Sequence, residues 1–129
     1  MARKRILLID DDPAVNEFLA AKLGAEVEVI STASPRDATR LAREQRPDLI
    51  LCDIDMPGMD GGDLSVELFD DDSIRGIPFV YLTGIASPRE IGARGGHLGG
   101  RKAISKHLPP DELLARVREF LDGEAARRE

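Results

Sequence analysis

The chain has 129 residues and a net charge of −6, and its composition already excludes several classes of protein. A single cysteine rules out an internal disulfide and a cysteine-based zinc site, and an aromatic content of 4% argues against stacking on nucleic-acid bases. No run approaches the ~20 apolar residues of a membrane span. We therefore expect one cytoplasmic domain that binds neither a membrane nor nucleic acid directly.

Short apolar runs and amphipathic stretches alternate along the first half of the chain. A strand is predicted at about 5–10, followed by a helix that starts near Pro13, where the missing N–H of proline does no harm. The alternation of valine and glutamate over 27–30 predicts an edge strand with one solvated face. Ser34 is predicted to be the N-cap of a second helix, and the apolar run 49–53 predicts a buried strand.

The second half of the chain continues the same alternation. A third helix is predicted at about 63–69 and a fourth strand at 79–83. Ser87 followed by proline indicates the start of a fourth helix. A short strand is predicted at 103–105, and a last amphipathic helix begins near Pro110.

Five strands alternating with five helices predict an α/β domain with a doubly wound, five-stranded parallel sheet and helices on both faces. The strand order 2-1-3-4-5 is one common solution, which periodicity alone does not select. The glycine-rich stretch 92–100 lacks the ending of a phosphate-binding P-loop. We expect it to shorten the fourth helix and to form a mobile connection.

Polar residues follow four of the apolar runs at the point where each predicted strand ends. They are Asp10 with Asp11, Asp53, Thr83 and Lys106. The carboxyl ends of parallel strands form the ligand crevice of an open α/β sheet, so these side chains are expected to meet. Carboxylates, a hydroxyl and an ammonium together suit the binding of Mg²⁺ and a phosphoryl group.

Each of these residues also has an ordinary explanation when it is taken alone. The acidic run at 10–12 could be a solvated helix start, and Asp12 is assigned that role. Thr83 could be a strand residue and Lys106 a surface lysine. Cys52 should point away from Asp53 along the strand and is expected to be a small core residue.

Four sequence motifs in this order resemble the receiver domain of bacterial two-component response regulators. They are IDDDP at 9–13, DIDMPGMDG at 53–61, LTG at 82–84, and Lys106 after a short strand. The resemblance implies the flavodoxin-like (CheY-like) sheet in the order 2-1-3-4-5. We assign residues 1–121 to the domain and 122–129 to a charged tail or linker stub.

The resemblance implies a role for each matching residue. Asp53 is similar to the aspartate that accepts a phosphoryl group from a sensor histidine kinase or a histidine phosphotransfer protein. Thr83 and Lys106 match the hydroxyl and the ammonium that meet this group. Such a domain is a signalling switch rather than an enzyme, apart from self-phosphorylation and slow autodephosphorylation. A downstream protein, an output domain or a second copy would read the change.

The resemblance also implies a Mg²⁺ site. Asp10, Asp11 and Asp53 match its carboxylates, and the backbone carbonyl of Asp55 falls where the family supplies a further ligand. The chemistry agrees, because a carboxylate nucleophile must approach a phosphoryl group of its own sign. A divalent cation and Lys106 would cancel that repulsion.

The chain departs from the family at two positions. Receivers usually have proline after the lysine, often in a cis peptide bond, but this chain has His107. A cis bond before a non-proline residue costs about 2.5–4 kcal/mol, so we predict a trans bond and a shifted loop. Ala103 stands where many receivers have an aromatic residue, which puts the usual coupling to an output surface in doubt.

Two other functions remain open from the sequence. A degenerate receiver would bind a protein partner without phosphate. The altered residues at 103 and 107 keep this reading open, whereas the intact set Asp10, Asp11, Asp53, Thr83 and Lys106 argues against it. A haloacid-dehalogenase-like phosphatase would use Asp53 as nucleophile and Asp55 as general acid. That class places its other acidic metal ligands after the lysine, whereas Asp10 and Asp11 precede the nucleophile here.

Overall fold

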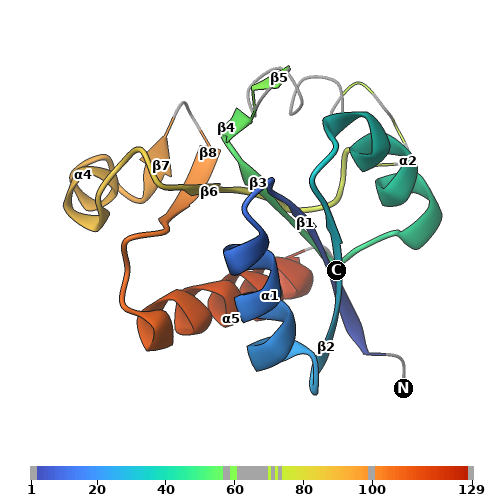
Figure 1. Ribbon diagram of the computed structural model, residues 1–129, viewed down its shortest axis with the longest axis horizontal. Helices are drawn as coiled ribbons and strands as arrows, with labels where there is room; N and C mark the ends of the chain where they lie inside the picture. Colours follow the sequence, from blue (N-terminus) through green and yellow to red (C-terminus); the bar gives the residue numbers. More distant parts are fainter. Residues whose placement is uncertain are drawn as a thin grey trace.

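The structure is a computed structural model that describes residues 3–56, 59–60, 70, 72, 74–98 and 101–127. The strands of the main sheet are β1 (Lys4–Ile9), β2 (Val27–Thr32), β3 (Leu49–Asp53), β6 (Phe79–Thr83), β7 (His97–Leu98) and β8 (Arg101–Ser105). The helices described are α1 (Pro13–Leu23), α2 (Pro35–Gln45), α4 (Pro88–Ala93) and α5 (Pro110–Arg127). A small antiparallel hairpin, β4 (Asp55–Met56) with β5 (Met59–Asp60), follows β3 (Figure 1).

The predicted strand order is confirmed. The main sheet runs β2-β1-β3-β6-β8-β7, so the five predicted strands, β1, β2, β3, β6 and β8, stand in the order 2-1-3-4-5. All pairs among these five strands are parallel. β2 lies at one edge and is partly exposed along its length, as its alternating sequence predicts.

The main sheet has one strand more than the five parallel strands that were predicted, and it lies at the other edge. There the short strand β7 pairs antiparallel with β8, within the stretch expected to be only a mobile connection. Gly95 and Gly96 have φ angles of 68° and 83°, a region that favours glycine. They follow α4 directly and turn the chain, so that β7 can run back along β8.

Helices cover both faces of the sheet, as the sequence predicts. Alternate residues of each buried strand point to opposite faces, so Ile6 and Leu8 pack on one side while Leu7 and Ile9 pack on the other. The first side is covered by α1 and α5, and the second by α2 and α4 (Figure 1). None of the helices in the described ranges is long and apolar enough to cross a membrane.

Three helix starts show how local sequence positions these elements. The Asp12 side chain caps α1 by accepting a hydrogen bond of 3.0 Å from Ala14 N–H, as predicted. Ser87 and Glu90 form a capping box at the start of α4. Ser34 stands at the N-cap position of α2, but its side chain makes no capping bond.

Two predictions about chain organisation concern residues 63–69 and the end of the domain. The helix predicted at 63–69 lies outside the described residues. The helix α5 continues to Arg127, past the domain boundary placed between 121 and 122. That boundary therefore stays a prediction.

Candidate functional site

The ends of β1, β3, β6 and β8 bring four predicted site residues to one edge of the sheet. Asp10 follows β1, Asp53 and Thr83 end β3 and β6, and Lys106 follows β8. The strand register aligns these ends. Ile9 of β1 pairs with Cys52 of β3, Asp53 of β3 pairs with Leu82 of β6, and Thr83 of β6 pairs with Ser105 of β8. The parallel topology therefore assembles the site from segments far apart in the sequence.

Three carboxylates form a compact acidic cluster. Asp10, Asp11 and Asp53 each offer an oxygen, and these oxygens lie within 4.8 Å of one another. Asp10 has no solvent exposure and Asp53 is 7% exposed, whereas Asp11 is open to solvent. The Oδ1 atom of Asp10 is held by the N–H of Asp12 at 2.9 Å. The cluster is thus buried at its base and accessible at one side.

The Lys106 ammonium lies between the two buried carboxylates. Its Nζ atom is 2.6 Å from Asp10 Oδ2 and 3.3 Å from Asp53 Oδ2. Burial alone would lower the pKa of Lys106, but hydrogen bonding and charge attraction from Asp10, reinforced by Asp53, outweigh it. The pKa is raised, so the side chain is a cation at neutral pH.

Burial raises the pKa of Asp10 above its ordinary value. The Lys106 ammonium and the N–H of Asp12 act in the opposite direction, while the charge of Asp53 adds to the rise. Among the residues that the structure describes, three clustered carboxylates lie beside the ammonium of Lys106. An additional cation at this place would relieve the repulsion between these carboxylates.

The donor set fits Mg²⁺. This ion prefers oxygen ligands and takes a few carboxylates with waters rather than a full protein cage. The buried Asp10 Oδ2 atom contacts the Lys106 ammonium and lies in the same cluster as the oxygens of Asp11 and Asp53. Asp10, Asp11 and Asp53 could therefore hold the cation. Asp55 lies in β4, two residues beyond Asp53, and its carbonyl as a ligand stays a prediction.

Thr83 is fully buried at the end of β6. Its Oγ1 atom accepts a hydrogen bond of 3.0 Å from Ile85 N–H, and its backbone carbonyl accepts one of 2.7 Å from Lys106 N–H. The second bond ties β6 to the residue that carries the ammonium. The hydroxyl is thus engaged by the following loop in this structure.

Cys52 is the core residue that the sequence predicts. It has no solvent exposure and packs on the side of the sheet covered by α2 and α4. Burial raises the pKa of its thiol to about 12, and the charges of Asp53 and Asp10 add to this. A thiol in this state is not a nucleophile, so Cys52 takes no part in the chemistry of the site.

The chain matches one known protein family over most of its length. The family described as "Response regulator receiver domain" matches residues 6–118. The chain belongs to this family. Its members are signalling switches of two-component systems rather than classical enzymes, and the resemblance seen in the sequence motifs is confirmed.

Curated relatives of the chain are response regulators. The DNA-binding response regulator MtrA of Mycolicibacterium smegmatis is 39% identical over 122 residues, which are 92% of this chain and 51% of MtrA. The response regulator PleD of Caulobacter vibrioides is 39% identical over 117 residues, which are 90% of this chain and 26% of PleD. The chain thus spans about half of one relative and about a quarter of the other.

Solved structures show the same fold. A CheY-like receiver domain protein from Methanospirillum hungatei has a TM-score of 0.77 at 27% identity, covering 98% of this chain and 99% of that one. The BeF3-activated receiver domain of RstA from Klebsiella pneumoniae has a TM-score of 0.71 at 34% identity, covering 92% and 98% of the two chains.

His107, which replaces the usual proline after the lysine, affects both the backbone and the contacts of this loop. The described part of the chain contains no cis peptide bond, so the predicted trans bond before His107 is confirmed. The ring of His107 reaches across to the loop after β6, where its Nε2 atom is 2.7 Å from the carbonyl oxygen of Gly84. Nothing in the sequence indicated this contact, because it joins two loops that are 23 residues apart.

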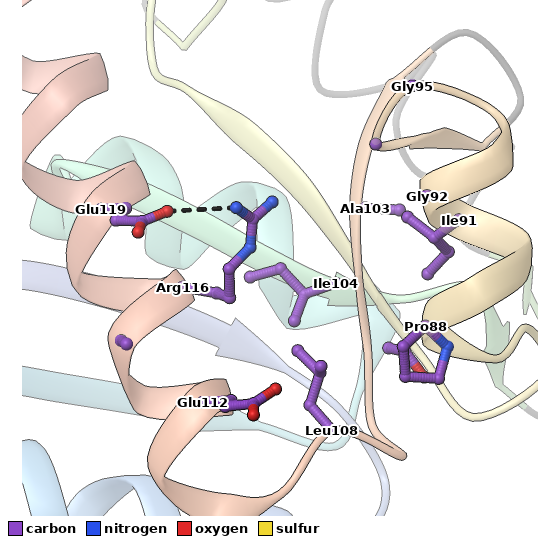
Figure 2. Close-up of a pocket in the computed structure, with 13 residues that line it drawn as sticks. Pro88, Ile91, Gly92, Gly95, Ala103, Ile104, Leu108, Glu112, Arg116 and Glu119 are labelled. Carbon is purple, nitrogen blue, oxygen red and sulfur yellow. Dashed lines mark hydrogen bonds and ion pairs between the residues drawn. The ribbon is translucent and has the colours of Figure 1, made fainter.

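The departure at 103 lies beside a groove. Ala103 is buried in β8 opposite Tyr81 of β6, and its methyl group lines a hollow of about 590 Å³ between α4, β8 and α5. Figure 2 shows Ile91 of α4 on one side of this hollow and Arg116 of α5, paired with Glu119, on the other.

Proposed function

We propose that the protein is a phospho-accepting switch of a two-component phosphorelay in the cytoplasm. Asp53 takes a phosphoryl group from a sensor histidine kinase or a histidine phosphotransfer protein, with Mg²⁺ held by Asp10, Asp11, Asp53 and the carbonyl of Asp55. One observation carries the proposal: the Lys106 ammonium bridges Asp10 and Asp53, two of the three carboxylates that cluster with Asp11. Packing alone would not collect these charges.

The proposed step transfers a phosphoryl group from a donor imidazole to the carboxylate of Asp53. An oxygen of Asp53 forms a bond to phosphorus as the bond between phosphorus and the donor imidazole breaks, and the imidazole leaves with the bonding electrons and takes up a proton. Bound Mg²⁺ would supply positive charge to the phosphoryl oxygens. The low exposure of Asp53, 7%, limits competing contact with water.

Lys106 and Thr83 have separate roles in this proposal. Lys106 already contacts Asp53. Its ammonium can therefore form an ion pair with an oxygen of the phosphoryl group on Asp53 without a large movement. Thr83 accepts a bond from Ile85 N–H, which holds its side chain toward the following loop, and we infer that this contact breaks when the side chain turns toward the phosphoryl group. The structure is therefore assigned to the resting state of the switch.

An apolar hollow beside the site suits a donor protein. It has a volume of about 210 Å³ and lies next to Lys106, between α1 and the start of α5. Its lining consists of Ala14, Val15, Phe18, Lys106, Leu108, Pro110 and Leu113. Apolar contact here would place a donor histidine over the acidic cluster.

The output of the switch is a protein contact. The groove between α4, β8 and α5 is a candidate surface for a downstream protein, an output domain or a second copy (Figure 2). The curated relatives are longer than the part that matches this chain. An output domain in the same protein is consistent with that.

Intact-mass analysis after incubation with acetyl phosphate tests the proposal. We expect one phosphoryl adduct that requires Mg²⁺ and is absent in Asp53→Asn. Asp122→Asn is the matched control, because this exposed aspartate lies on α5 and pairs with Lys4, away from the site. A folded wild-type protein that takes no phosphoryl group would instead favour the phosphate-independent binding module.

A further inference from the structure

One peptide unit in the loop after β6 is held at both of its polar ends. The carbonyl oxygen of Gly84 and the N–H of Ile85 belong to the same peptide plane. The carbonyl lies 2.7 Å from Nε2 of His107, and the N–H donates to Oγ1 of Thr83 at 3.0 Å. The orientation of this plane is therefore shared by a residue of the site and by the ring of His107.

In the hydrogen bond between His107 and Gly84, the identity of the donor follows from the chemistry of the two groups. A carbonyl oxygen only accepts hydrogen bonds, so Nε2 of His107 must carry the proton in this arrangement. The ring thus acts as a donor to Gly84. Gly84 and Ile85 are both exposed, and the side chain of Ile85 is 66% exposed, so apolar packing does little to hold this peptide.

Ser105 strengthens the link between the two loops. Its buried hydroxyl donates to the carbonyl of Ala86 at 2.8 Å and accepts from the N–H of His107 at 3.1 Å. The carbonyls on both sides of Ile85 are thus held by two residues that flank Lys106. The proline that usually follows the lysine has no N–H and no ring donor, so it could make neither of the contacts of His107.

We propose that His107 is a positioning residue, which fixes the Gly84–Ile85 peptide and so keeps the hydroxyl of Thr83 in its resting orientation. This inference rests on the proposed function. When the contact to Gly84 is lost, the peptide can turn, the N–H of Ile85 releases Thr83, and the hydroxyl is free to meet a phosphoryl group. The contact therefore shifts the equilibrium toward the resting state.

Two substitutions separate the ring contact from other effects at this position. His107→Gln places an amide nitrogen near the place of Nε2 and keeps a donor for Gly84. His107→Asn has the same functional group on a shorter side chain, which places its nitrogen near Nδ1 and out of reach. Both variants retain the backbone N–H that donates to Ser105.

The first readout is the rate constant of phosphorylation by acetyl phosphate at saturating Mg²⁺. We expect His107→Asn to be phosphorylated about two- to tenfold faster than the wild type, the range for the net loss of one hydrogen bond, and His107→Gln to match the wild type. Equal rates in all three proteins, or a slower rate in His107→Asn alone, would overturn the proposal.

The second readout is amide hydrogen exchange at Ile85, measured by NMR without any phosphodonor. His107→Asn should exchange this amide severalfold faster than the wild type and His107→Gln, because the peptide is free to turn. Unchanged exchange would show that His107 does not hold the peptide. If the wild type takes no phosphoryl group, the proposed function fails, and exchange at Ile85 still decides the role of His107.

Discussion

The Lys106 ammonium lies 2.6 Å from a carboxylate oxygen of Asp10, a side chain with no solvent exposure. A carboxylate buried without a partner is costly, so Lys106 supplies the counterion at the base of the site. The same ammonium reaches Asp53 at 3.3 Å. Stability and chemistry of the site thus depend on one lysine.

Removal of this lysine should destabilise the protein in a pH-dependent way. We expect Lys106→Met to lower the free energy of unfolding by about 3 kcal/mol near neutral pH, the low end for a broken buried pair, because Lys106 is partly exposed. The pKa of Lys106 is raised above its ordinary value of 10.5, so the stabilisation is complete below that pH and is lost as pH rises through the folded pKa.

Urea unfolding in the presence of a chelator, followed by circular dichroism, checks this expectation. The difference between wild type and Lys106→Met should shrink when the pH is raised above 10.5. A difference that stays constant over this range would mean that the ion pair with Asp10 is not its source.

The acidic run at 10–12 provides a matched pair of variants for the metal site. Asp11→Asn should raise the Mg²⁺ concentration needed for thermal stabilisation about tenfold or more, or about 1.4 kcal/mol, because a charged ligand is lost. Asp12→Asn should remain close to the wild type, since Asp12 caps α1 and asparagine caps equally well. Similar losses in both variants would point to general charge attraction instead of ligation.

Cys52 should be inert until the protein unfolds. Its thiol is fully buried and its pKa is about 12, so almost no thiolate is available or accessible at neutral pH. Reaction with a thiol reagent should follow the unfolding transition in urea, and Mg²⁺ should delay it by stabilising the folded state. Rapid modification in the absence of urea would contradict the assigned packing of β3.

The groove beside β8 predicts an unusual tolerance for a large residue. Ala103→Phe should cost less than about 1 kcal/mol, because the ring can enter the hollow between α4 and α5. Ala42→Phe is the control, since Ala42 is equally buried under α2 but does not line this groove, and it should cost about 3 kcal/mol or fail to fold. Urea midpoints compare the two, and equal losses would show that the groove cannot accept the ring.

Much of the site could be predicted from sequence because its residues follow buried strands. Asp10, Asp53 and Lys106 stand directly after or at the ends of apolar runs, and parallel strands bring such ends to one edge. The strand period also predicted that Cys52 faces the core. These inferences needed only the positions of the apolar runs, the alternation of side chains along a strand and the expectation of a parallel sheet.

Other features depend on contacts that no local pattern encodes. The strand β7 has only two residues, and the turn before it uses positive φ angles that a glycine-rich sequence permits but does not require. The contact of His107 with Gly84 joins separate loops, and its formation depends on how β6 and β8 align. Sequence marked His107 only as a departure from its family.

The most direct test of the account is to locate the phosphoryl group. The protein would be incubated with acetyl phosphate and Mg²⁺, the acyl phosphate reduced with borohydride to leave a stable alcohol, and the modified residue identified by peptide mass spectrometry. We predict a single modified residue, Asp53. Modification at Asp10 or Asp11, whose oxygens lie within 4.8 Å of those of Asp53, or at several carboxylates without a need for Mg²⁺, would contradict the account.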